Sequence, residues 1–157
     1  MKEARQRPTV DEQSDFVRAA VNRYYYSVFL RCRKRISIYG RKWGKQTHSK
    51  IFEYFRKDIP RIIEDRVTSL MDEQLIEEYL AREIVEQAKF DGLYISEKLH
   101  DFHALRNVAD YSNKPCISFQ EPEGYFVEIT PLVDLREWQA DIDARITQLL
   151  KVLDDVS

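Results

Sequence analysis

The side chains best suited to chemistry lie on one expected helix, residues 94–113. When the residues are projected around the helix axis at 100° per residue, the side opposite the core carries a polar stripe of His100, His103, Asn107 and Tyr111. The guanidinium of Arg106 and the carboxylate of Asp110 lie along the flank of this stripe. An arginine offers a permanently charged, planar donor fork for a phosphate. A histidine titrates near neutral pH and can act as a general base. The stripe could therefore hold a phosphate and move a proton beside it.

The same stripe also has plainer interpretations. Arg106 and Asp110, four residues apart, can form a surface ion pair worth about 0.2–0.5 kcal/mol on a solvated helix face. His100 and His103 lack a third spaced ligand, so they do not predict a metal site. The sequence has no glycine-rich phosphate loop and no serine or cysteine nucleophile pattern. We therefore expect neither a metal nor a cofactor.

Composition indicates one helical domain in a reducing, cytoplasmic setting. The chain has 157 residues, 43% hydrophobic and 33% charged, with only four glycines and five prolines. This length predicts a single domain, residues 1–157, with 1–10 as a flexible tail. We expect no membrane span and no signal peptide, because no apolar stretch is long enough. Cys32 and Cys116 alone predict no disulfide framework.

The charge is unevenly distributed along the chain. Residues 1–57 hold 15 Lys and Arg against 5 Asp and Glu, whereas residues 58–157 hold 10 against 22. A basic segment can meet nucleic-acid phosphates, and it can equally pair with the acidic remainder inside one bundle. The basic loop expected at 41–46 contributes Arg41, Lys42 and Lys45 as candidate RNA contacts.

Helical periodicity predicts an all-α antiparallel bundle of about five helices, with a small β-hairpin insertion near 116–129. The first helix is expected to begin near residue 11 or 14 and to end near residue 38. Three further helices are expected over residues 48–57, 61–90 and 94–113. The last helix is expected to begin at Thr130–Pro131. The third divides near Met71–Asp72, and Asp91–Gly92 separates it from the fourth. Core stripes are expected on the first helix (Phe16, Ala19, Ala20, Tyr24, Val28, Cys32) and the fourth (Phe102, Leu105, Ala109).

Three short stretches resemble one branch of the HEPN family, a helical superfamily of prokaryotic toxin–antitoxin and defence systems. Residues 23–29 are similar to its Arg-x-Tyr-Tyr-x-x-Phe segment, and residues 47–51 with Phe55 resemble its Thr-His-Ser segment. Residues 106–111 resemble its Arg-x-x-Ala-Asp-Tyr motif. Their order and spacing make the likeness moderately specific over residues 23–111.

The resemblance implies a metal-free nuclease motif that departs from the active form at one position. Active HEPN nucleases carry Arg-x4-6-His, often beginning Arg-Asn, and act as dimers that bring two motifs together. Arg106 and Asn107 match, but Tyr111 occupies the histidine position of the shortest spacing, and no histidine follows it. A tyrosine with a pKa of about 10 is a poor base at pH 7, although it can position a phosphate or stack on a base. His103 could supply the imidazole instead.

Two functions therefore stay open, beside a third, structural interpretation as a dimerising bundle with no ligand site. The first is an RNA-directed protein of a toxin–antitoxin or defence system, with endoribonuclease residues Arg106, Asn107, Tyr111 and His103, and RNA contacts at Arg23, Tyr26, Asp110, Arg41, Lys42 and Lys45. The second is a non-catalytic HEPN module that binds RNA or a nucleotide, or scaffolds a partner protein. A homodimer is expected, as is a cognate antitoxin or defence partner. His48 is interpreted as structural.

Overall fold

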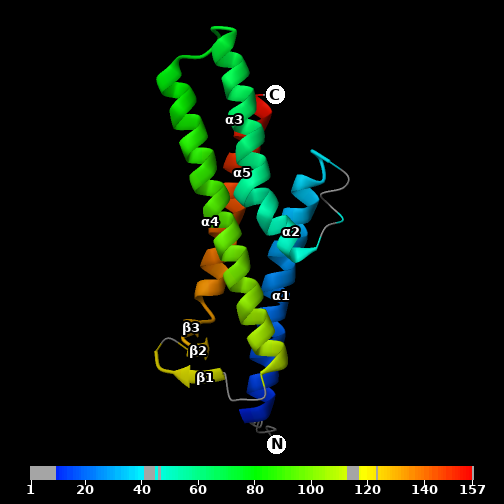
Figure 1. Ribbon diagram of the computed structural model, residues 1–157. Coiled ribbons are helices and arrows are strands. Elements are labelled where there is room, and N and C mark those ends of the chain that lie inside the picture. The colour runs from blue at the N-terminus through cyan, green and yellow to red at the C-terminus, as the bar shows by residue number, and fades with distance from the viewer. Residues whose placement is uncertain (1–9, 41–44, 46, 113–116, 123, 157) are drawn as a thin grey trace, which may run out of the picture.

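The computed structural model describes residues 10–40, 45, 47–112, 117–122 and 124–156. They form an elongated bundle of long helices with a small sheet at one end (Figure 1). The helical elements are α1 (Val10–Ile36), α2 (His48–Glu53), the π-helical turn η2 (Tyr54–Asp58), α3 (Ile59–Asp72), α4 (Glu78–Tyr111) and α5 (Asp134–Asp155). The expected all-α class with a small β insertion is confirmed.

The boundaries of the helices from α2 to α4 differ from expectation in two places. The α2, η2 and α3 elements follow one another without a break, so the described residues form four continuous helical rods where about five were expected. The expected break at Asp91–Gly92 is wrong, because α4 runs through both residues. Gly92 serves packing instead: a Cβ there would lie 2.2 Å from the backbone oxygen of Phe55. The glycine lets α4 approach η2 closely.

The β insertion is confirmed as an antiparallel hairpin, with a further short strand. β1 (Ile117–Gln120) pairs with β2 (Gly124–Val127), and β2 pairs with β3 (Thr130–Pro131). The last helix was expected to begin at Thr130–Pro131, and that expectation is wrong. Those residues pair with the sheet, and the backbone N–H of Leu132 donates to the carbonyl of Tyr125 at 2.7 Å. As a result α5 begins only at Asp134.

One hydrophobic core runs along the bundle between the rods. On α4, the expected core residues Phe102, Leu105 and Ala109 are buried, as predicted. On α1 the predicted stripe is wrong at its start, because Phe16 is 71% exposed and its neighbour Val17 is fully buried. The core stripe of α1 consists instead of Val17, Val21, Tyr25, Val28, Phe29, Cys32 and Ile36. Its first half is therefore rotated by one residue from the prediction.

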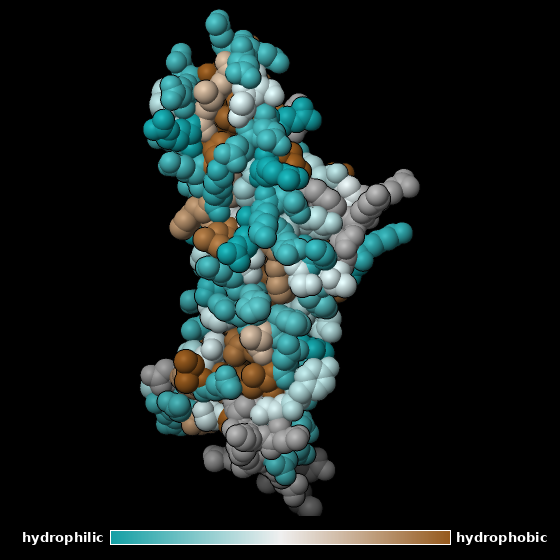
Figure 2. Space-filling view, viewed as in Figure 1, coloured by the Kyte–Doolittle hydropathy of each residue, from teal (hydrophilic) through white to brown (hydrophobic). Residues whose placement is uncertain are grey.

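The surface is mainly hydrophilic on the face drawn in Figure 2, with small hydrophobic patches along the bundle. Among the residues that the structure describes, no helix combines the length and apolarity needed to cross a bilayer. The α1 and α4 rods lie against each other over the end of the bundle near the sheet (Figure 1). This contact positions the candidate site.

Candidate functional site

Three helices bring the candidate site residues together. The last turns of α4 carry Arg106 and Asp110, the middle of α1 carries Asn22, and α2 begins at His48. The guanidinium of Arg18 on α1 donates a hydrogen bond to the carbonyl of Ala109, in the final turn of α4. A cation at a helix C-terminus complements the helix dipole, so this contact fixes the end of α4 against α1.

Arg106 lies at the centre of a closed polar network. Its Nε donates to Asn22 Oδ1 at 3.3 Å, and its Nη1 donates to Asn107 Oδ1 at 3.0 Å. Its Nη2 lies 2.8 Å from Asp110 Oδ2, with the two side chains 18% and 20% exposed. The amide of Asn22 donates to the other oxygen of Asp110. Each guanidinium nitrogen is thus engaged within the protein, and the Asp110 carboxylate neutralises the charge of Arg106.

Two aromatic rings lie close to this guanidinium. The Cζ of Arg106 is 5.8 Å from the ring centre of Tyr26 on α1 and 5.3 Å from that of Tyr111. Both distances suit cation–π attraction. Tyr26 is 39% exposed and Tyr111 is 70% exposed, so both phenols are open to solvent. Exposed rings beside a cation can stack on unpaired bases whose phosphate the cation holds.

Two imidazoles lie in an aromatic cluster next to this network: His103, one turn before Arg106 on α4, and His48 at the start of α2. The rings of His48 and His103 stack with centroids 5.3 Å apart, and the ring of Phe29 stacks on His48 at 4.0 Å. Tyr25, fully buried, shares a hydrogen bond between its hydroxyl and His48 Nδ1. The cluster therefore joins α1, α2 and α4 beside the arginine.

The environment of this cluster keeps both imidazoles neutral. Burial lowers the pKa of His103, and the positive charge of Arg106 lowers it further. Burial also lowers the pKa of His48, helped by His103 and Arg106. Burial raises the pKa of the Tyr25 hydroxyl, so this hydroxyl keeps its proton in the hydrogen bond that it shares with His48 Nδ1. Neutral imidazoles are the form that can accept a proton.

The structure places the expected site residues in two groups. In the first group, Asn107, Asp110, Tyr111 and Tyr26 surround the guanidinium of Arg106, and His103 lies one turn before it along α4.

Other expected contacts lie apart from this network. Arg23 lines a separate apolar groove between α1 and α5, together with Phe16, Ala20 and Gln139. Lys45 is exposed, and Arg41 and Lys42 lie outside the described residues.

Sequence reasoning gave too little weight to Asn22 and His48. Asn22 bonds both Arg106 and Asp110, and His48 packs on His103 from a different helix. The signal for His48 was present in the Thr47–His48–Ser49 segment, but periodicity within one helix cannot show a contact between helices. Interpreting His48 as only structural therefore missed its place beside the motif helix.

In the part of the chain that the structure describes, no three histidine, cysteine or acidic side chains are grouped so that they could hold a metal ion. The side chains that are brought together are a guanidinium close to two phenol rings and, one turn along α4, an imidazole with a lowered pKa. Comparison with protein-family models, curated proteins and solved structures gives no match for this chain.

Proposed function

We propose that this protein is a HEPN-like, cytoplasmic protein of a prokaryotic toxin–antitoxin or defence system that cleaves RNA without a metal. One observation carries the proposal: Arg106 lies within cation–π distance of two exposed tyrosines, and His103, whose pKa is lowered, lies one helical turn away on the same helix. The arginine supplies charge for a phosphate and the imidazole supplies a base. The resemblance of residues 106–111 to the HEPN motif supports the same substrate.

The chemistry follows from these two groups. Arg106 holds the non-bridging oxygens of the scissile phosphate, after Asp110 has given up its place. His103 takes the proton of the 2′-hydroxyl, and the 2′-oxygen attacks phosphorus. The bond to the 5′-oxygen breaks, and that oxygen takes a proton from water. The products are a 2′,3′-cyclic phosphate and a 5′-hydroxyl, with no metal in any step.

Incubation of total RNA and tRNA with the purified protein in EDTA tests this function. Wild type should produce fragments that end in 2′,3′-cyclic phosphate, and Arg106→Ala should produce none. Circular dichroism of both proteins controls for folding. If RNA stays intact with wild type at high protein concentration, the nuclease proposal fails.

A second candidate is an RNA-binding module without catalysis, or a scaffold for a partner protein. The observation that favours it is the Asp110 carboxylate, which already neutralises Arg106, together with Tyr111 at the histidine position of the motif. In this case Arg106→Ala weakens RNA binding while neither protein cuts RNA. If Arg106→Ala leaves RNA binding unchanged, the site-based form of this candidate fails too.

We further propose that the chain forms a homodimer and meets a cognate antitoxin or defence protein. The apolar groove between α1 and α5, of about 410 Å³, supports an interface because Phe16 stands exposed beside it. Light scattering tests the dimer, and a monomer at high concentration would contradict it. Phe16→Glu should then weaken association without changing the helical content.

A further inference from the structure

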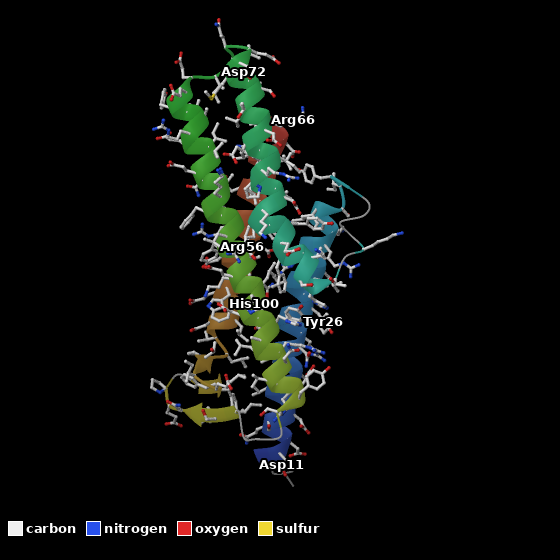
Figure 3. The ribbon with its side chains drawn as sticks, viewed as in Figure 1. Asp11, Tyr26, Arg56, Arg66, Asp72 and His100 are labelled. Carbon is white, nitrogen blue, oxygen red and sulfur yellow. The ribbon has the colours of Figure 1, made fainter. Side chains whose placement is uncertain are left out.

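A second polar hollow lies next to the Arg106 site along α4. It is a groove of about 590 Å³ between the α2–η2 segment and α4, lined by Ser49, Glu53, Arg56, Ser96, Glu97 and His100, among others. Figure 3 labels Arg56 and His100 in the middle part of the bundle, where these helices meet. The function proposed above assigns no role to this groove.

The groove carries more negative than positive charge. Three carboxylates line it, those of Glu53, Glu97 and Asp101, against the single guanidinium of Arg56. Lys50 pairs with Glu53 at 2.8 Å, and Lys98 pairs with Asp101 at 3.5 Å. Among the described residues Glu97 has no such ion pair, so its two oxygens are available as acceptors. Such a groove repels a phosphate and suits a neutral group that donates hydrogen bonds.

A hydroxyl in the groove wall adds a polar group beside the carboxylates. Ser96 is only 8% exposed and lines the groove, and within the part of the chain that the structure describes no residue bonds its hydroxyl. This oxygen is not among the fully buried unpaired atoms, so its remaining exposure is to the groove. A ligand that enters the groove can therefore exchange a hydrogen bond with Ser96.

The groove continues directly into the imidazole cluster beside Arg106. The ring of Phe52, in the groove wall, has its centroid 6.3 Å from that of His100 and 6.1 Å from that of His103. His100 precedes Arg106 by six residues of helix, a rise of about 9 Å. Neighbouring nucleotides of an extended single strand can span this distance. A strand whose phosphate lies at Arg106 can therefore place an adjoining base in the groove.

We propose that this groove is a nucleobase subsite selective for guanine, a proposal that rests on the RNA-directed function of Arg106. Guanine presents two adjacent donors on its Watson–Crick edge, N1–H and the 2-amino group, which match the two oxygens of the Glu97 carboxylate. Adenine and cytosine present one donor beside an acceptor there, and that acceptor faces a carboxylate oxygen unfavourably. The exposed imidazole of His100 offers a surface for stacking. Glu97 is thus the residue that reads the base.

Binding of three RNA hexamers tests the subsite, each uridine-rich with one central guanosine, inosine or adenosine. Inosine lacks only the 2-amino group, so wild type should bind the guanosine hexamer roughly tenfold more tightly than the inosine hexamer. Glu97→Gln should remove this preference, because an amide offers only one acceptor oxygen. Glu83→Gln, on the exposed surface of the same helix, is the matched control and should keep it.

The outcomes separate this proposal from the one on which it rests. If Arg106→Ala weakens binding of all three hexamers but wild type binds guanosine and inosine equally, the subsite is overturned and the RNA-directed function stands.

A second measurement does not depend on RNA binding at Arg106. Titration with guanosine 5′-monophosphate should shift the backbone amide signals of Ser96 and Glu97 in NMR spectra more than titration with inosine 5′-monophosphate. If it does so while no hexamer binds, the groove stands and the RNA-directed function fails. If both nucleotides leave these signals unmoved, the subsite is overturned.

Discussion

Substitution of Asp110 by asparagine should strengthen RNA binding, because the carboxylate competes with phosphate for Arg106. Asp110 Oδ2 lies 2.8 Å from Arg106 Nη2, and its other oxygen accepts the amide of Asn22. Asparagine keeps the shape and one acceptor oxygen but removes the negative charge. The guanidinium then stays in place and is free to meet a phosphate.

The size of the effect follows from two contributions. A phosphate no longer has to break a partly exposed ion pair, which is worth about 0.5–1 kcal/mol in such a setting. It also no longer approaches a carboxylate about 4 Å away, a repulsion of about 1 kcal/mol in water. Together these give about 1.5–2 kcal/mol, or roughly 10- to 30-fold tighter binding. The slope of log K against log salt concentration should steepen by about 0.7, as for one additional phosphate contact with a single strand.

Fluorescence anisotropy with a labelled single-stranded RNA in EDTA measures both quantities. Glu64→Gln is the matched control: it also removes one negative charge and breaks an ion pair, that of Glu64 with Lys89 at 2.7 Å, but on α3. If Asp110→Asn binds no more tightly than Glu64→Gln, the carboxylate does not compete for Arg106 and the reasoning is refuted.

Four further predictions concern pH and packing. Because the pKa of His103 lies below its ordinary 6.5, cleavage should rise with pH only below this value and then level off; a rise centred above 6.5 would argue against His103 as base. Because the pKa of His103 is lower in the folded than in the unfolded protein, the unfolded state binds a proton at higher pH. Thermal stability should therefore fall as pH drops from about 6.5, and a His103→Asn variant with the same pH dependence would contradict this role of His103. Gly92→Ala should destabilise the fold by about 1–3 kcal/mol in chemical denaturation, because its Cβ would meet the backbone oxygen of Phe55, and an unchanged midpoint would contradict that contact. Arg145→Met alone should lower the free energy of unfolding more than Arg145→Met combined with Asp91→Asn, because the single substitution leaves the buried Asp91 carboxylate without its cation. Equal free energies of unfolding for the two variants would show that this carboxylate needs no partner.

The sequence predicts burial well where one helix face is clearly apolar. On α4, the spacing of Phe102, Leu105 and Ala109 identifies the core side, and their burial follows. On α1, one apolar stripe at helical spacing starts at Phe16 and another starts at Val17, and either stripe could form the buried face of the helix. Only packing against α4 and α5 decides between them. Periodicity cannot make that choice, because both stripes fit a helix equally.

The site is predictable along one helix and unpredictable between helices. Helical spacing alone predicts that His103, Arg106 and Asp110 lie on the side of α4 that faces away from the core. It cannot show that Asn22 of α1 bridges Arg106 and Asp110, nor that His48 of α2 stacks on His103. Gly92 misleads for a related reason, because a glycine required by a neighbouring helix looks the same in sequence as a glycine that ends one.

Cleavage of RNA by Arg106 and His103 without a metal can be measured in single turnovers. An end-labelled RNA is incubated in EDTA with wild type, Arg106→Ala or His103→Asn, and thermal melts confirm that the variants fold. Wild type should cleave the RNA, and each variant should lose roughly 100-fold or more of the cleavage rate. Intact RNA with wild type, or cleavage by His103→Asn at the wild-type rate, would show that these two side chains do not carry the reaction.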